Sequence, residues 1–123
     1  MSLLNNFYKV QELTAGENGN HIAMVMLNAQ HDIFKGHFPG NPVTPGVCMM
    51  QIIKELTQQI TGEKLMMKQA TNVKFMALIN PEKTPELKIE LDVKDMGDTV
   101  SVKNTTCFGD TVALKLSCNF SKN

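Results

Sequence analysis

Apolar residues follow two different periods along this chain, and the first is helical. Between Val47 and about Ile60 they recur every three or four positions. The apolar side of this segment carries Met49, Ile52, Ile53, Leu56 and Ile60, and the polar side carries Gln51, Lys54, Glu55 and Gln58. This spacing predicts an amphipathic helix that buries one side. We expect the helix to end at Gly62, because glycine readily adopts the left-handed conformation that closes many helices.

The second period is two, which is typical of β-strands. Apolar side chains at 87, 89, 91 and 93 alternate with charged ones, and those at 112, 114, 116, 118 and 120 alternate likewise. Strands are predicted over residues 6–13, 21–27, 64–69, 71–79, 86–94, 99–108 and 111–120. Residues 21–27 are apolar on both faces, so we expect that strand to be buried. Turn-forming residues separate several strands, at 15–20, 95–98 and 108–111.

One helix with a set of antiparallel strands defines the α+β class. A lone amphipathic helix must bury its apolar side, and a sheet wrapped around it is the simplest arrangement. The 123 residues suffice for a single core, and no repeat or linker interrupts them. We therefore expect one domain over residues 1–123.

Charge and cysteine content argue against several classes of protein. The formal net charge is zero and every basic residue is lysine, which provides no basic stripe for nucleic acid and no polybasic membrane patch. No apolar run is long enough to span a membrane, and the first residues lack a signal-peptide pattern. The cysteines at 48, 107 and 118 are odd in number and lack metal-binding spacing. These features predict a cytoplasmic protein with reduced thiols.

The loop before the helix carries the most distinctive chemistry. Residues 28–46 show no periodicity, and residues 36–46 read G-H-F-P-G-N-P-V-T-P-G. Three prolines and three glycines restrict this backbone and hold its one ionisable side chain, His37, in place. Pro45 is expected at the first helical position, where its missing N–H costs nothing. Gly46 then presents its backbone amide at the positive end of the helix.

This segment resembles the active-site segment of the β-hydroxyacyl-acyl carrier protein dehydratases, the FabZ- and FabA-like enzymes of fatty-acid synthesis. The resemblance covers G-H-F-P-G-N-P-V-x-P-G-V and the helix after it, and it is thinner around Asn72-Val73-Lys74-Phe75. It implies a hotdog fold, in which an antiparallel sheet wraps a central helix. It also implies a homodimer, or a multiple of dimers, that builds each site between two subunits.

The resemblance further implies a role for each residue of the loop. His37 is expected to be the general base that removes the proton α to a thioester carbonyl, a task that suits imidazole. Gly46 is expected to donate its N–H to the thioester oxygen, where negative charge develops. Phe38, Pro45 and Val47 neighbour these two residues in the motif and are expected to contact substrate. No cofactor or metal is required, because proton transfer and charge stabilisation suffice.

The helix departs from the family at one catalytic position. The family places an acidic residue fourteen positions after the histidine, and in this chain that residue is Gln51. An amide has no proton of suitable acidity for a departing hydroxyl group. Glu55 lies one turn further on, where the family commonly carries Gln, so the acid and the amide look exchanged. Gln51 and Glu55 are both candidates to orient or protonate the hydroxyl, and the alternative for Glu55 is a plain solvated carboxylate.

The resemblance, taken with these residues, leaves three functions open. The first is a dehydratase acting on a 3-hydroxyacyl thioester of acyl carrier protein or coenzyme A, with Lys35, Lys54 or Lys74 docking a small acidic carrier protein. The second is a hotdog acyl thioesterase, in which Glu55 activates water and Gln51 positions the thioester. The third is a catalytically impaired acyl-binding subunit that has lost its acid.

The remaining candidates have simpler interpretations. Cys48 lies between Val47 and Met49 and is expected to be a small buried hydrophobe rather than a nucleophile. The pair His31-Asp32 lacks further ligands at fixed spacing, so no metal site is predicted. Five methionines lie near the helix and its neighbouring strands, where they fill the core or line a tunnel for an acyl chain: Met49, Met50, Met66, Met67 and Met76.

Overall fold

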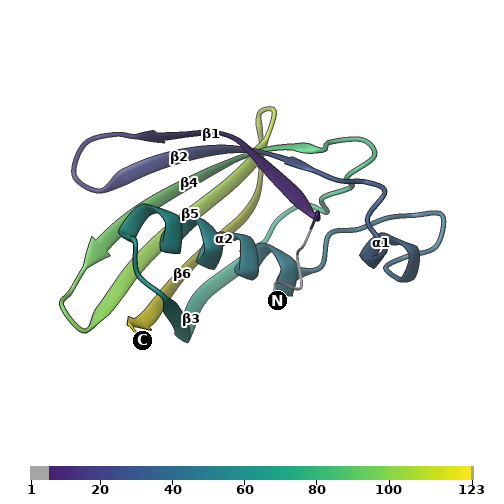
Figure 1. Ribbon diagram of the computed structural model, residues 1–123. Coiled ribbons are helices and arrows are strands. Elements are labelled where there is room, and N and C mark those ends of the chain that lie inside the picture. Colours follow the sequence, from purple (N-terminus) through teal and green to yellow (C-terminus); the bar gives the residue numbers. More distant parts are fainter. Residues whose placement is uncertain (1–5, 123) are drawn as a thin grey trace.

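The computed structural model describes residues 6–122 (Figure 1). The strands within this range are β1 (Tyr8–Ala15), β2 (Asn20–Leu27), β3 (Leu65–Phe75), β4 (Glu86–Asp95), β5 (Thr99–Phe108) and β6 (Thr111–Lys122). The helices are α1 (Ile33–Gly36) and α2 (Gly46–Thr61).

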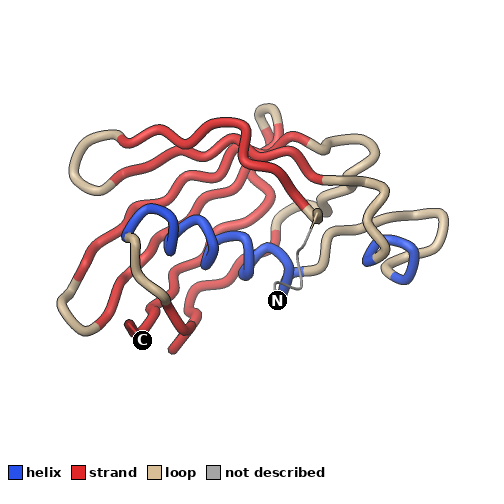
Figure 2. The backbone as a smooth tube through the Cα atoms, viewed as in Figure 1, coloured by secondary structure: helices blue, strands red, loops and turns tan. Residues whose placement is uncertain are grey.

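All six of these strands join in one antiparallel sheet, in the order β1-β2-β4-β5-β6-β3. The sheet curves around α2, which lies along its concave face (Figure 2). This arrangement confirms the α+β class and the central helix wrapped by a sheet. It leaves β1 and β3 as the two edges of the sheet in the described chain.

Helix α2 forms where its apolar period predicted it. The side chains that it buries are Cys48, Met49, Ile52, Ile53, Leu56 and Thr57. All of these except Thr57 share one core cluster with alternate residues of the strands, among them Val25, Leu87, Ile89, Leu91, Val102 and Phe120. Burying each large apolar side chain contributes about 1.5–3 kcal/mol, so α2 and the sheet stabilise each other. The helix ends as predicted at Gly62, whose φ is 73° and whose N–H donates to the Gln58 carbonyl at 2.8 Å.

The start of α2 differs from the prediction by one residue. Pro45 is the N-cap, with φ −62° and an extended ψ of 144°, and Gly46 is the first helical residue. Proline accepts this position because its fixed φ also suits extended backbone, and the Pro45 carbonyl still accepts the first helical hydrogen bonds, from Cys48 and Met49.

Strand β3 corrects two expectations at once. The separate strands predicted at 64–69 and 71–79 are one strand, Leu65–Phe75, paired with β6. Its register shifts between Met67 and Gln69 and again between Thr71 and Lys74, and Asn72 has a positive φ of 52°. These irregularities interrupt the alternation without ending the strand, as β-bulges do. The strand ends at Phe75, so residues 76–79 form a loop.

Strand β2 was expected to be buried on both faces, and this is wrong for one face. Ala23, Val25 and Leu27 are buried in the core that α2 shares. The other face carries Ile22 and Met24, which are only partly buried. The sheet is a single layer with its helix on one side, so the outer face of β2 has no covering element among the described residues.

Candidate active site

The His37 loop is held by two hydrogen bonds between its ends. The Nδ1 atom of His37 lies 3.0 Å from the Val43 carbonyl oxygen, and the Val43 N–H donates to the His37 carbonyl at 2.9 Å. A carbonyl oxygen only accepts, so Nδ1 carries the proton and the neutral ring keeps the lone pair of Nε2. The Phe38 ring stacks on the imidazole with centroids 4.2 Å apart. The loop thus fixes both the position and the tautomer of His37.

The N-terminus of α2 lies next to this imidazole. Thr44 connects the loop to the segment that follows β3, because its N–H donates to the Ile79 carbonyl at 2.9 Å. Gly46 opens the helix, and amides of a first turn have no partner within their own helix. A Cβ at Gly46 would lie 2.8 Å from the Cζ atom of Phe75. Glycine therefore lets the Phe75 ring approach the amide end of the helix.

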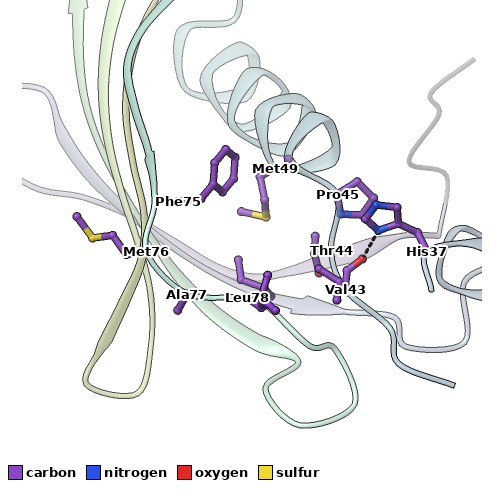
Figure 3. Close-up of a pocket in the computed structure, with 11 residues that line it drawn as sticks. His37, Val43, Thr44, Pro45, Met49, Phe75, Met76, Ala77 and Leu78 are labelled. Atoms are coloured by element: carbon purple, nitrogen blue, oxygen red, sulfur yellow. Dashed lines mark hydrogen bonds between the residues drawn. The ribbon is translucent and has the colours of Figure 1, made fainter. Parts of the chain in front are cut away.

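A pocket of about 410 Å³ joins these features (Figure 3). It is lined by His37, Val43, Thr44, Pro45, Gly46, Met49, Phe75, Met76, Ala77, Leu78 and Ile79. Most of these side chains are apolar, and the polar groups gather at the loop end, as in pockets that bind an apolar ligand with a polar head. Of the five methionines considered above, Met49 and Met76 line the pocket.

The predicted site residues fall into two groups. His37, Pro45 and Gly46 line the pocket. Phe38 and Val47 are outside its lining: Phe38 stacks on the imidazole, and the Val47 side chain is 75% exposed. Contact of these two residues with substrate stays a prediction.

Gln51 and Glu55 form a second polar site on α2, outside the lining of the pocket. The Gln51 Nε2 atom donates to Glu55 Oε2 at 2.9 Å. The Tyr8 hydroxyl, at the start of β1, donates to Glu55 Oε1 at 2.7 Å. Burial, followed by the hydrogen bond and the charge of Glu55, raises the pKa of Tyr8 well above its usual range. Glu55 is therefore no plain solvated carboxylate, since it joins the helix to the first strand.

Tyr8 is a site residue that sequence reasoning missed. It lies 47 residues from Glu55, and the alternation along residues 6–13 accounted for it as a strand residue. Only the curvature that brings β1 over α2 places the two side chains together (Figure 1). We predict that Gln51, rather than Glu55, lies closest to the His37 imidazole of a partner subunit; this concerns a second chain and stays a prediction.

The other candidate residues, Cys48 and His31, take part in packing and hydrogen bonding. Cys48 is buried, which raises the pKa of its thiol and disfavours the nucleophilic thiolate. The His31 ring packs edge-on against Phe7, and its Nδ1 accepts a hydrogen bond from the Ile33 N–H at 3.1 Å. No group of three His, Cys, Asp or Glu side chains suited to a metal ion occurs in residues 6–122. Nor does any helix in that range have the length and apolar character needed to cross a membrane.

Solved structures define the class of fold. One chain of the dehydratase heterocomplex ApeI:P from Xenorhabdus doucetiae superposes with a TM-score of 0.74 at 17% identity, covering 92% of this chain and 96% of the other. The protein smu.793 from Streptococcus mutans, bound to acetyl CoA, gives a TM-score of 0.66 at 14% identity, covering 100% and 93%. These similarities establish the hotdog fold.

Sequence similarity establishes the family. A family model described as ApeI-like, ApeI dehydratase, matches residues 13–115. The 3-hydroxyacyl-[acyl-carrier-protein] dehydratase FabZ of Levilactobacillus brevis is 30% identical, over 98% of this chain and 88% of its own length. The FabZ of Clostridium acetobutylicum is 30% identical over 68% of this chain and 62% of its own. The chain belongs to the ApeI-like dehydratase family.

Proposed function

We propose that the protein removes water from a 3-hydroxyacyl thioester to give a trans-2-enoyl thioester, in fatty-acid synthesis or a related lipid pathway. The observation that carries this proposal is the His37 imidazole. Its Nδ1 is bound to the Val43 carbonyl and its ring lines an apolar pocket at the N-terminus of α2. A base beside a positive helix end suits the abstraction of a proton α to a carbonyl. The relatives named FabZ support the same reaction and the acyl carrier protein as carrier.

The proposed reaction uses the loop and the helix in turn. His37 Nε2 takes the proton from C2, and the electron pair moves onto the thioester oxygen, which the Gly46 N–H stabilises as an enolate. The enolate then collapses to the C2–C3 double bond while the C3–O bond breaks. Gln51 lies outside the lining of the pocket in its own chain, so in the proposed dimer the Gln51 amide of one subunit meets the substrate held at His37 of the other. This amide accepts a hydrogen bond from the 3-hydroxyl and orients it, but cannot protonate it. The imidazolium of His37 returns its proton to the departing oxygen, which forms water and restores the base.

The assay for this proposal is incubation of the purified protein with 3-hydroxyacyl and enoyl thioesters of several chain lengths. We expect slow interconversion of the two thioesters, because no acid occupies position 51. Release of free thiol without interconversion would instead support the thioesterase. That second function is favoured by one observation, the Glu55 carboxylate held beside the Gln51 amide at 2.9 Å, where it is able to activate water. Tight acyl binding without either reaction would support the impaired acyl-binding subunit.

We further propose that the working unit is a homodimer or a multiple of one. Strand β3 is an edge of the sheet, and it and the loop after it expose apolar side chains, among them Phe75 at 53%, Met76 at 51% and Leu78 at 74%. An unpaired edge with exposed apolar residues favours pairing with a second chain. Light scattering at micromolar concentration is expected to give a multiple of the dimer mass, and a monomeric mass would refute the proposal.

The carrier protein is expected to dock through one or more of the lysines at 35, 54 and 74. Lys74 precedes Phe75 in β3 and Lys54 lies on α2, whereas Lys35 already forms an ion pair with Asp32 at 3.1 Å. Charge reversal of Lys74 is expected to raise KM for the carrier-bound substrate more than for a coenzyme A substrate. A cytoplasmic location remains part of the proposal.

A further inference from the structure

Tyr8 links the first strand to the polar side of the central helix. It is the one tyrosine of the chain, and its ring is partly buried at the start of β1. Its hydroxyl donates to Glu55 Oε1 at 2.7 Å. A hydrogen bond to a carboxylate is stronger than one between neutral groups, and partial burial strengthens it further. Tyr8 therefore holds the Glu55 side chain in one rotamer.

Glu55 in turn orients the Gln51 amide. Its other oxygen, Oε2, accepts a hydrogen bond from Gln51 Nε2 at 2.9 Å. A carboxylate accepts and does not donate, so the nitrogen of the amide faces Glu55 and the carbonyl oxygen faces away. A pair of residues four apart on a helix surface is by itself a weak restraint. The bond from Tyr8 fixes the carboxylate, and thereby the direction of the amide.

We propose that Tyr8 is a positioning residue for the dehydration, which acts through Glu55 to hold the Gln51 carbonyl oxygen as the acceptor for the substrate's 3-hydroxyl group. The proposal rests on the function proposed above. In this role Tyr8 does not touch the reacting atoms. It contacts Glu55, and only the Gln51 amide contacts the substrate. The raised pKa of Tyr8 agrees with it, since the phenol then stays protonated and keeps donating at neutral and moderately alkaline pH.

The kinetic test compares Tyr8→Phe, Glu55→Gln and the double variant. Tyr8→Phe keeps the packed ring and removes the hydroxyl alone. We expect each single variant to lower kcat about fivefold with little change in KM, because a loosely held amide presents its oxygen in several directions. If Tyr8 acts through Glu55, the double variant loses no more than either single one. The proposal is overturned if the two losses in kcat multiply in the double variant, or if Tyr8→Phe retains the full kcat.

A spectroscopic test measures the contact without any turnover. The chain has one tyrosine and no tryptophan, so the ultraviolet absorbance of tyrosinate reports Tyr8 alone. Glu55→Gln removes the charge and alters the hydrogen bond, and we expect it to lower the pKa of Tyr8 toward the ordinary value for tyrosine. The matched control is Glu12→Gln, an exposed carboxylate on the same strand that bonds Thr14. The control is expected to leave the titration unchanged, and an unchanged titration in Glu55→Gln would overturn the proposal even if Tyr8→Phe failed to fold.

The two proposals fail in different ways. A wild-type protein that does not interconvert 3-hydroxyacyl and enoyl thioesters refutes the proposed function, whatever the Tyr8 titration shows. An active wild type with a fully active Tyr8→Phe variant refutes the role of Tyr8 alone.

Discussion

The two polar regions of this molecule are built in different ways. The His37 loop is held by its own backbone: Val43 bonds both the ring and the carbonyl of His37, six residues away. The site on α2 is held by side chains, with Glu55 bonded to Gln51 four residues away and to Tyr8 47 residues away. The first region is local and restricted by proline and glycine. The second is completed by Tyr8 only because the sheet curls over the helix.

This difference predicts how substitutions in each region affect the fold and the reaction rate. The loop is a rigid frame whose single reactive group is the imidazole, so that substituting this group should remove the chemistry and leave the fold. The α2 site is a network in which each group directs the next, so substitutions there should tune the rate. The following changes test this contrast, from the largest expected effect to the smallest.

His37→Ala should have the largest effect. Loss of a general base costs about two to four powers of ten in rate, and the partly exposed side chain adds little to the core. We expect turnover of the 3-hydroxyacyl thioester to vanish and the thermal unfolding midpoint to stay near that of the wild type. The matched control is His21→Ala, because His21 also bonds a carbonyl through Nδ1, that of Gly19 at 2.9 Å, but near the start of β2. Equal losses in both variants, or unfolding of His37→Ala, would remove His37 from the role of base.

Gln51→Glu should raise the rate. It places a second carboxylate beside Glu55, and two carboxylates at hydrogen-bond distance hold a proton between them, which supplies the missing acid. We expect kcat to rise by about tenfold or more. The control is the double exchange Gln51→Glu with Glu55→Gln, which restores one acid and one amide in the opposite order and should also exceed the wild type.

The opposite pattern of kinetic effects would place the working acid one helical turn further along α2. If Glu55→Gln silences the protein and Gln51→Glu does nothing, Glu55 is the working acid. The axial separation of the two Cα positions, roughly one turn or 5.4 Å, is an argument against Glu55 as a replacement for an acid at position 51. The structure weakens that argument, since the Glu55 carboxylate reaches back to within 2.9 Å of the Gln51 amide.

The same contrast explains what could be predicted from the sequence. The helix, its glycine stop and the strand over 99–108 depend on local periodicity. The helix predicted over 47–60 spans 46–61, and the stop and the strand are where the pattern predicted them. The register of β3 shifts on both sides of residue 70, between Met67 and Gln69 and between Thr71 and Lys74, and there one strand was predicted as two. His37 and Gly46 were found through a dense local motif and do line one pocket. Tyr8 was missed because its partner is distant in sequence, and no local pattern encodes such a contact.

Gly46→Ala should have a moderate effect on binding. The new Cβ would lie 2.8 Å from the Phe75 Cζ, and the half-exposed ring must move away from the pocket. We expect KM to rise about fivefold with a change in stability below about 1 kcal/mol, because the ring end is free to turn toward solvent. Combining it with Phe75→Leu should recover part of the loss, since the shorter side chain leaves room for the methyl group. If the double variant binds no better, the methyl group itself obstructs the amide.

Thr44→Val should have the smallest effect, on stability alone. The Thr44 hydroxyl is buried in the wall of the pocket and has no hydrogen-bond partner in residues 6–122. Valine has nearly the same shape, so we expect the free energy of unfolding to rise by about 1 kcal/mol and kcat to stay unchanged.

Thr106→Val is the matched control for this change. Thr106 is also buried, but its hydroxyl donates to Asn104 Oδ1 at 3.1 Å, so its loss should lower the free energy of unfolding by about 1 kcal/mol. If Thr44→Val is as destabilising as the control, the Thr44 hydroxyl is bonded in the working protein. In that case the loop depends on a group beyond its own segment, as the α2 site depends on Tyr8, and the contrast between the two regions would be one of degree.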